Sequence, residues 1–314
     1  MSNLLFRRAA ATRGLRVFTY TVVPLAPTVG VLQWVDHAIP FGAYLTGDGK
    51  TGGAHGRYFP DEPTSQACAA RLAEVAGARA AVKKRVLLDL YAEFSPALHY
   101  FFWEGFAEVG AWWGARRAFT DSAAAASLVG YVVGLGDRHG GNLLLHRRTA
   151  EWIHVDLGIA FDQSRMLPIP EQVPFRLTRN VVDGLGVEGV GGGFAAAAEA
   201  VLWRLRERRE LLLAILDAVV QDPLTRWAIR PFSDSSEGVE ASLNASAAFA
   251  RARRRRGNAS AGDARRTLAR VADKLAGVDG NEQLGVGVQV RKLIQDAQSV
   301  ENLSMMFRGW SPWL

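Results

Sequence analysis

The chain has 314 residues, of which 49% are hydrophobic and 22% charged, so its composition is that of a globular protein with a sizeable core. A single cysteine, Cys68, excludes an intramolecular disulfide and a zinc site built on several thiolates, and it favours a reducing, intracellular setting. The formal charge is +6, and much of it lies in residues 251–270. That basic run could contact nucleic acid, an acidic protein or an import receptor, but it is more typical of a solvated loop.

The N-terminal segment predicts a helix end followed by a β-hairpin. The first 18 residues contain four arginines and no acidic residue, as mitochondrial presequences do, but they continue without a break into structured sequence. Residues 15–24 are rich in β-branched and aromatic types and predict a strand, with a partner strand at 31–35. The uncharged run 17–35 alternates like a strand and contains two prolines, so we expect no membrane-spanning helix.

The rest of the chain alternates between long helical patterns and short apolar strands. A Gly-rich loop at 45–63 precedes the helices, and residues 156–178 lack periodicity and contain three prolines, which predicts a long loop. Helices are predicted at 64–94, 97–106, 115–131, 193–220 and 263–276, strands at 142–146 and 151–158, and a linker at 231–262. A few strands among many helices indicate an α+β fold.

Residues 134–162 gather the polar side chains that phosphoryl transfer requires. Asp137 lies five positions before Asn142, and Asp156 follows Asn142 by 14, with a predicted hairpin between them that would return Asp156 toward Asn142. A carboxylate can accept a hydroxyl proton, while an amide oxygen and a second carboxylate can hold Mg²⁺. Each residue alone is a common turn former, but the spacing and the hairpin together favour a phosphoryl-transfer site.

Several segments resemble one family of kinases. The sequence GLGDRHGGN (134–142) followed by HVDLG (154–158) resembles the phosphatidylinositol-3-kinase-related protein kinases, in which Arg and His follow the catalytic Asp. TYTVVPLAPTVGVLQWV (19–35), MLPIPEQVPFRLTRNVVDGLGVEGVGGGF (166–194) and NLSMMFRGWSPWL (302–314) are similar to the ataxia-telangiectasia-mutated (ATM) branch. The last of these resembles the FATC segment that ends such kinases.

The resemblance covers roughly residues 15–230 and 282–314 and implies a protein-kinase-like catalytic fold of the phosphatidylinositol-kinase type. That α+β fold would have a partial small β lobe and a mostly helical large lobe. The implied divisions are a remnant of the small lobe and hinge at 1–36, the large lobe at 37–230, a basic regulatory insert at 231–281 and a FATC-like segment at 282–314.

The resemblance also implies roles for individual residues. Asp137 would be the catalytic base and His139 would stabilise charge at the transferring phosphate, with Asn142 and Asp156 binding Mg²⁺ or Mn²⁺. Tyr20 would contact ATP deep in the pocket, and Leu144 would form the floor of the pocket. The other residues expected to contact ATP lie in the hinge: Gln33, Trp34 and Val35. Residues 156–178 would be the activation loop, with Pro174, Phe175 and Arg176 binding the substrate.

The implied activity is transfer of the ATP γ-phosphate to Ser or Thr followed by Gln, in the nucleus and in the response to DNA damage. Partners would be such protein substrates, DNA-damage complexes that recruit a region upstream of this chain, and a second copy of a full-length parent, with no membrane. We expect the tryptophan-rich tail to pack against the large lobe near the activation loop, and the aromatic stretch 100–106 to lie mainly in the core.

Three departures from the family are visible. The family often has bulkier residues where this chain has Gly140 and Gly141, and an acidic hinge residue where it has Gln33. The largest departure is that no Gly-rich phosphate loop precedes Tyr20 and that the first lysine is Lys50, beyond the hinge. We therefore expect the chain to be a fragment with little or no kinase activity alone.

Two other functions remain open from the sequence. A phosphoinositide lipid kinase of the same superfamily would need clustered cations, but residues 156–178 contain only Arg165 and Arg176, with acidic Asp162 and Glu171. A non-catalytic scaffold or pseudokinase is favoured by the missing lysine and disfavoured by the intact polar residues of 134–162.

Overall fold

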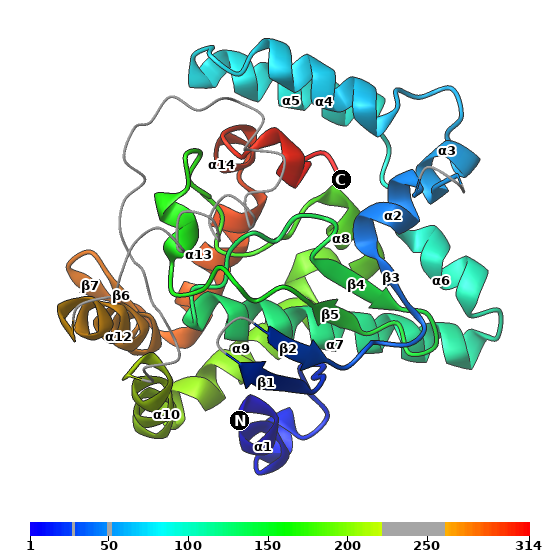
Figure 1. The fold of residues 1–314 in the computed structure, drawn as a ribbon. Coiled ribbons are helices and arrows are strands. Elements are labelled where there is room, and N and C mark those ends of the chain that lie inside the picture. The colour runs from blue at the N-terminus through cyan, green and yellow to red at the C-terminus, as the bar shows by residue number, and fades with distance from the viewer. Residues whose placement is uncertain (27–28, 49–51, 222–260) are drawn as a thin grey trace.

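The computed structural model describes residues 1–26, 29–48, 52–221 and 261–314. Figure 1 shows a mostly helical body with a three-stranded sheet on one side and a separate two-stranded hairpin near the N-terminus. The predicted α+β class is confirmed, because helices predominate and the few strands form small antiparallel sheets.

The N-terminal segment is helical and packs against the body. It forms α1 (Ser2–Arg7) and a 3-10 helix, η1 (Ala10–Thr12). Phe6 is fully buried, and the Leu5 carbonyl accepts a hydrogen bond from Arg204 Nε at 3.0 Å. The structure thus shows a helical N-terminal segment, as the sequence predicted.

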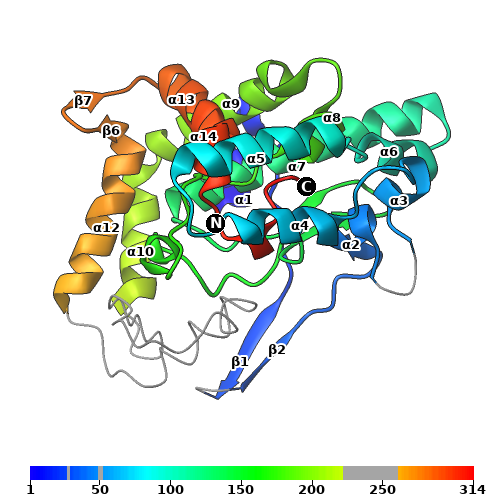
Figure 2. The same ribbon diagram turned by 90° about the horizontal axis from the view of Figure 1, so that it is seen from above.

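The N-terminal hairpin consists of β1 (Val22–Ala26) and β2 (Val29–Leu32), paired antiparallel. Figure 2 shows it extending away from the helices, and its side chains are exposed. The prediction of a strand from residue 15 is wrong for residues 15–21. The ladder ends where the Gln33 side-chain oxygen accepts the Thr21 N–H at 3.0 Å, in place of a backbone carbonyl.

The central sheet has the order β3–β4–β5, with all strands antiparallel: β3 (Ala38–Pro40), β4 (Leu143–His146) and β5 (Trp152–His154). Leu143 and Leu145 alternate inward and are fully buried, which fixes the register of β4 against β5. The predicted hairpin is thus present, although β5 is shorter than the expected 151–158.

Helix α7 (Val109–Val132) forms the centre of the core. Its small buried alanines, 123–126, allow close approach of α9 (Gly193–Glu207) and of β5. Ser122 Oγ accepts the Trp152 N–H at 2.8 Å and so joins this helix to the sheet. The predicted helix at 115–131 is confirmed, with an earlier start.

The remaining helices surround this core. The pattern predicted from residue 64 divides into two helices with Gly77 between them, where helix propensity is lowest. The helices are α2 (Phe41–Thr46), α3 (Ala54–Tyr58), α4 (Ser65–Glu74), α5 (Ala80–Glu93), α6 (His99–Gly105), α8 (Arg179–Leu185), α10 (Arg209–Gln221) and α12 (Ala261–Ala276). In α6, Phe101 and Phe102 are buried as expected, whereas Trp103 is 62% exposed.

Two sequence predictions fall partly outside the described residues. The linker at 231–262 and the basic run at 251–270 are described only from Ala261 onward, where α12 begins. Across the described ranges no single helix is long and apolar enough to span a membrane, and α8 with residues 189–207 passes that test only as a pair bent by 60°.

The C-terminal tail packs against the body, as predicted. After the short pair β6 (Val278–Asp279) and β7 (Glu282–Gln283), it forms α13 (Val286–Gln298), α14 (Val300–Ser304) and the 3-10 helix η5 (Arg308–Trp310). Trp310 and Trp313 are 3% and 1% exposed, and Trp313 Nε1 donates to Ser65 Oγ at 3.1 Å. Figures 1 and 2 place the C-terminus beside the helices of the body.

Candidate functional site

The loop between α7 and β4 depends on two glycines. At Gly134 φ is +61°, and a Cβ there would lie 2.3 Å from the Asp162 nitrogen. A Cβ on Gly136 would lie 2.3 Å from Ser164 Cβ and 2.7 Å from Glu171 Oε2. Only glycine therefore lets this loop approach the segment that follows β5 so closely.

The structure brings together the three residues that the sequence assigns to phosphoryl transfer. Asn142 Nδ2 donates to the Asp137 carbonyl at 2.8 Å and lies 3.4 Å from Asp137 Oδ2. The Val155 N–H donates to the Asn142 carbonyl at 3.0 Å, so the β4–β5 hairpin returns Asp156 to Asn142. Asp137 and Asn142 are buried, whereas Asp156 is exposed and open to a ligand.

Both aspartates have left-handed backbones. The φ angle is +59° at Asp137 and +50° at Asp156. Such conformations cost a non-glycine residue on the order of 1–3 kcal/mol and persist only where the surroundings hold them. Left-handed non-glycine residues cluster at functional sites, and the two predicted carboxylates are among the seven that occur in the described ranges.

Arg138 ties the loop to the segment that precedes Asp156. Its guanidinium donates to the carbonyls of Gly136 (2.8 Å), Val155 (2.8 Å) and Asp156 (2.5 Å). The side chain is buried, and burial lowers its pKa while the Asp137 carboxylate opposes the shift. Arg138 therefore fixes the spacing between the two aspartates.

His139 is held as a neutral hydrogen-bond donor. The Gly141 N–H donates to His139 Nδ1 at 3.0 Å, so a neutral ring carries its proton on Nε2. Burial lowers the pKa of His139, against the opposing effect of Asp137. A Cβ on Gly141 would lie 2.9 Å from the His139 ring, which gives a physical reason for this departure from the family.

Close packing also explains why glycine occupies position 140. A Cβ there would lie 3.1 Å from Gly42 Cα, and the Gly42 N–H donates to the Gly140 carbonyl at 2.9 Å. The loop thus rests directly on the start of α2.

The residues expected to contact ATP are less closely grouped. Tyr20 is partly buried, and burial raises its pKa. The charge of Arg138 lowers this pKa and that of Asp156 raises it, so Tyr20 lies near the polar cluster. Leu144 is in β4, opposite Ile153 and Pro40.

The hinge residues lie between β2 and β3. The Gln33 N–H donates to the Thr21 carbonyl at 2.8 Å, Val35 is half-buried, and Trp34 is 83% exposed. The contacts of these residues with adenine stay predictions.

The residues expected to bind the substrate are mostly enclosed. Pro174 is half-buried, while Phe175 and Arg176 are 5% and 4% exposed. The Arg176 guanidinium donates to the carbonyls of Trp310 (2.7 Å), Ser311 (2.8 Å) and Leu314 (3.0 Å), and burial lowers its pKa to about 9. The structure thus gives Arg176 a role in holding the tail, and substrate contact stays a prediction for this group.

Sequence reasoning missed two residues of the site. Arg138 was expected only as part of a motif, and Glu171 only as an acidic residue in a loop. Glu171 accepts the Asp137 N–H, with oxygen distances of 3.0 and 2.9 Å. Its position between two prolines was the available signal, since an acid in an apolar, rigid loop needs a hydrogen-bonding partner.

Asn142 and Asp156 fit a hard divalent cation. The hydrogen bond from Asn142 Nδ2 to Asp137 directs the amide oxygen away from Asp137, and Asp156 adds a carboxylate. No group of three or more His, Cys, Asp or Glu that could hold a metal occurs within the described ranges. Mg²⁺ commonly uses one or two carboxylates together with phosphate oxygens, and Asn142 and Asp156 are ligands of the kind that it takes from a protein.

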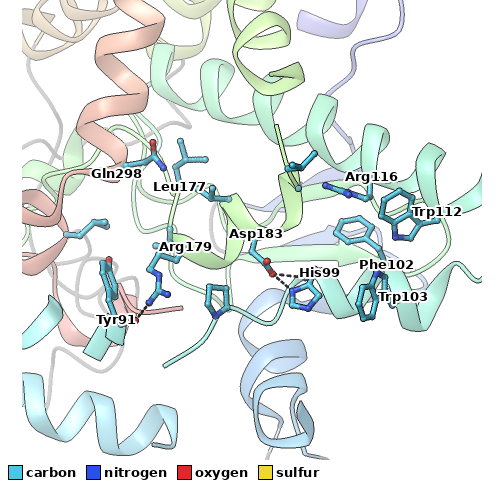
Figure 3. Close-up of a pocket in the computed structure, with 16 residues that line it drawn as sticks. Tyr91, His99, Phe102, Trp103, Trp112, Arg116, Leu177, Arg179, Asp183 and Gln298 are labelled. Atoms are coloured by element: carbon cyan, nitrogen blue, oxygen red, sulfur yellow. Dashed lines mark hydrogen bonds and ion pairs between the residues drawn. The ribbon is translucent and has the colours of Figure 1, made fainter. Parts of the chain in front are cut away.

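A separate cavity of about 710 Å³ lies between α5, α6, α7, α8 and the C-terminal helices (Figure 3). His99 and Asp183 pair within it at 2.8 Å, and Arg179 donates to the Tyr91 carbonyl at 2.5 Å. None of the predicted site residues lines this cavity.

Comparison with known proteins agrees with the geometry. The family model "Phosphatidylinositol 3- and 4-kinase" matches residues 1–229, and the "FATC domain" model matches residues 283–314. The serine/threonine-protein kinase ATM of Arabidopsis thaliana is 42% identical over 96% of this chain, and the serine-protein kinase ATM of Sus scrofa is 38% identical over 100% of it. The chain spans only 8% and 11% of those relatives.

Solved structures show the same fold. The structure "FAT and kinase domain of CtTel1" superposes with a TM-score of 0.83 at 33% identity, over 99% of this chain and 20% of that one. The "Tel1 kinase butterfly symmetric dimer" gives 0.82 at 33% identity, over 99% of this chain and 12% of that one. The chain therefore belongs to the phosphatidylinositol 3- and 4-kinase family, in the branch of the ATM and Tel1 protein kinases, with a FATC domain at its end.

Proposed function

We propose that this chain forms the catalytic part of an ATP-dependent serine/threonine protein kinase of the ATM type. The observation that supports it most is the joint placement of Asp137, Asn142 and Asp156, linked by the Asn142 amide and the β4–β5 hairpin. The ATM and Tel1 relatives, which are named as protein kinases, support the same activity.

In this proposal each polar side chain has a defined role. Asp137 accepts the proton of the substrate hydroxyl, and Asn142 anchors its backbone. His139, neutral and with its proton on Nε2, donates to an oxygen of the transferring phosphate. Asn142 and Asp156 hold Mg²⁺, which when bound neutralises charge on the phosphates.

The part of the site that would bind ATP is incomplete in residues 1–314. Tyr20, Gln33, Trp34, Val35 and Leu144 would contact the nucleoside, but the sequence before Tyr20 contains neither lysine nor a Gly-rich loop. Each missing charge-assisted contact to a phosphate is worth about 1.5–3 kcal/mol. Residues 1–314 alone should therefore show little or no kinase activity, and robust transfer that requires Asp156 would contradict this.

The finer functions are also proposals. We infer a preference for Ser or Thr followed by Gln, with Pro174, Phe175 and Arg176 near the substrate, and a nuclear role in the response to DNA damage. Protein substrates and DNA-damage complexes would be the partners. The solved "Complete CtTel1 dimer with C2 symmetry" supports a homodimer of a longer protein that contains this chain.

A hybrid kinase tests the proposal against its alternatives. This chain would replace the matching region of the Arabidopsis thaliana relative, and the segment upstream of that region would be retained from the relative to supply the missing lysine and loop. The hybrid should phosphorylate a Ser-Gln peptide, a Ser-Ala peptide much less, and phosphoinositide vesicles not at all. Transfer to the vesicles would favour the lipid-kinase alternative, and no transfer by a folded hybrid would favour a scaffold.

A further inference from the structure

We propose that Glu171, in the activation loop, is a positioning residue that holds the catalytic Asp137 in its left-handed backbone conformation. The inference rests on the proposed kinase function for its consequence, but its structural part stands on the contacts alone. In this proposal the activation loop contacts the catalytic base directly through a hydrogen bond.

The contact is a hydrogen bond from the backbone N–H of Asp137 to the carboxylate of Glu171. The Asp137 N–H faces both carboxylate oxygens, with N···O distances of 3.0 and 2.9 Å. Asp137 is buried, and a buried backbone N–H that loses its acceptor destabilises the fold, so this contact holds the nitrogen in place. The two residues are 34 positions apart, so the contact joins two separate loops.

The other polar group of the same residue is also held by a side chain. The Asp137 carbonyl accepts from Asn142 Nδ2 at 2.8 Å. The φ angle of +59° is therefore fixed from both sides, by Glu171 at the nitrogen and by Asn142 at the carbonyl. Loss of either partner would let the backbone relax toward an ordinary conformation and would redirect the carboxylate.

The surroundings of Glu171 are built to keep its carboxylate in place. Gly136 leaves the space for it, since a Cβ there would lie 2.7 Å from Glu171 Oε2. The Glu171 N–H donates to the Ser164 carbonyl at 3.3 Å, and Ser164 is buried beside the carboxylate. Burial raises the pKa of Glu171, against the opposing effect of the Asp137 N–H.

The consequence is a coupling between substrate-binding and catalytic segments. Pro174 lies three residues after Glu171 in the same loop, so a displacement of this loop would remove the acceptor from Asp137. The catalytic base would keep this orientation only while Glu171 stays in the position that the structure shows.

Hydrogen exchange of residues 1–314 tests the contact without any need for activity. Glu171→Ala removes the acceptor, Glu171→Gln keeps an oxygen at the same reach, and Gln172→Ala changes an exposed neighbouring side chain. In Glu171→Ala, exchange in the peptide that spans residues 134–142 should be faster by about tenfold. Glu171→Gln and Gln172→Ala should exchange like the parent, and equal protection in all four proteins would overturn the proposal.

Kinetics of the hybrid kinase test the consequence. Glu171→Ala should lower kcat on the order of 100-fold with little change in the KM for ATP, since the base is misplaced while the nucleotide site is intact. Glu171→Gln should recover most of the rate. A parallel loss of kcat, ATP affinity and melting temperature in both variants would instead show a purely structural role and overturn the proposal.

An inactive parent hybrid would count against the proposed function, not against the contact. In that case hydrogen exchange alone decides whether Glu171 holds Asp137, so failure of the two proposals can be told apart.

Discussion

At the scale of single residues, the site depends on how closely two loops approach each other. The segments that carry Asp137, Asn142 and Asp156 lie beside one another because Arg138 holds three carbonyls and because glycine occupies positions 134 and 136. The motif spacing was enough to predict that these segments are neighbours. It was not enough to predict Glu171, because that contact depends on the path of a loop without periodicity.

The tightness of this approach predicts the effect of Gly136→Ala. The new Cβ would lie 2.3 Å from Ser164 Cβ, so the two loops must separate. We expect a loss of about 1–3 kcal/mol in the free energy of unfolding, measured with urea. Gly114→Ala is the control, since it lies inside α7 and its Cβ would meet no side chain or other element within 4 Å, so alanine there should stabilise by about 0.5–1 kcal/mol. Equal effects of the two substitutions would contradict the close approach.

His154 predicts how stability depends on pH. Trp152 Nε1 donates to His154 Nε2 at 3.2 Å, which requires an unprotonated nitrogen, and burial lowers the pKa of His154 to about 3. In the unfolded chain this histidine titrates near 6.5. Below that pH the unfolded state binds the extra proton, so the folded state loses up to about 1.4 kcal/mol per pH unit from this group.

The measurement is urea unfolding between pH 7.5 and 5. The His154→Gln variant should show a smaller loss of stability over this range than the parent. The same slope in both proteins would show that other groups, not His154, cause the acid sensitivity.

At the scale of elements, the β4–β5 hairpin and the C-terminal tail carry the catalytic arrangement. The hairpin was predictable because the short apolar runs NLLLH and EWIHV flank the polar segment RRTA. The tail was predictable because its tryptophans are too apolar to remain in water. The N-terminal strand was placed too early, since its end depends on the Gln33 side chain that caps the ladder. The division between α4 and α5 was missed because Gly77 interrupts an otherwise continuous pattern.

The buried tail predicts that Trp313→Ala destabilises the fold strongly. The side chain is 1% exposed and its indole N–H donates to Ser65 Oγ. We expect a loss of about 3–5 kcal/mol in thermal or urea unfolding. Trp34→Ala, at an 83% exposed position, should cost much less. A tail that is dispensable for stability would show no difference between the two, and deletion of residues 305–314 would then also be neutral.

At the scale of the whole molecule, the residues predicted to contact ATP come from separate parts of the chain. Tyr20 comes from the N-terminal segment, Leu144 from the central sheet, and the polar cluster from the loops beside it. The resemblance gave the family and the location of this region. The burial of some side chains, such as Arg176, could not be predicted, because it depends on hydrogen bonds to carbonyls of the tail.

The most direct test of the central claim is binding of Mn²⁺ with a non-hydrolysable ATP analogue to the hybrid kinase, followed by electron paramagnetic resonance. If Asn142 and Asp156 hold the metal, Asp156→Asn and Asn142→Ala should each weaken metal–nucleotide binding by at least about tenfold. Asp61→Asn, an exposed carboxylate outside the site, should bind like the parent. Unchanged binding in the Asp156 and Asn142 variants would contradict the account.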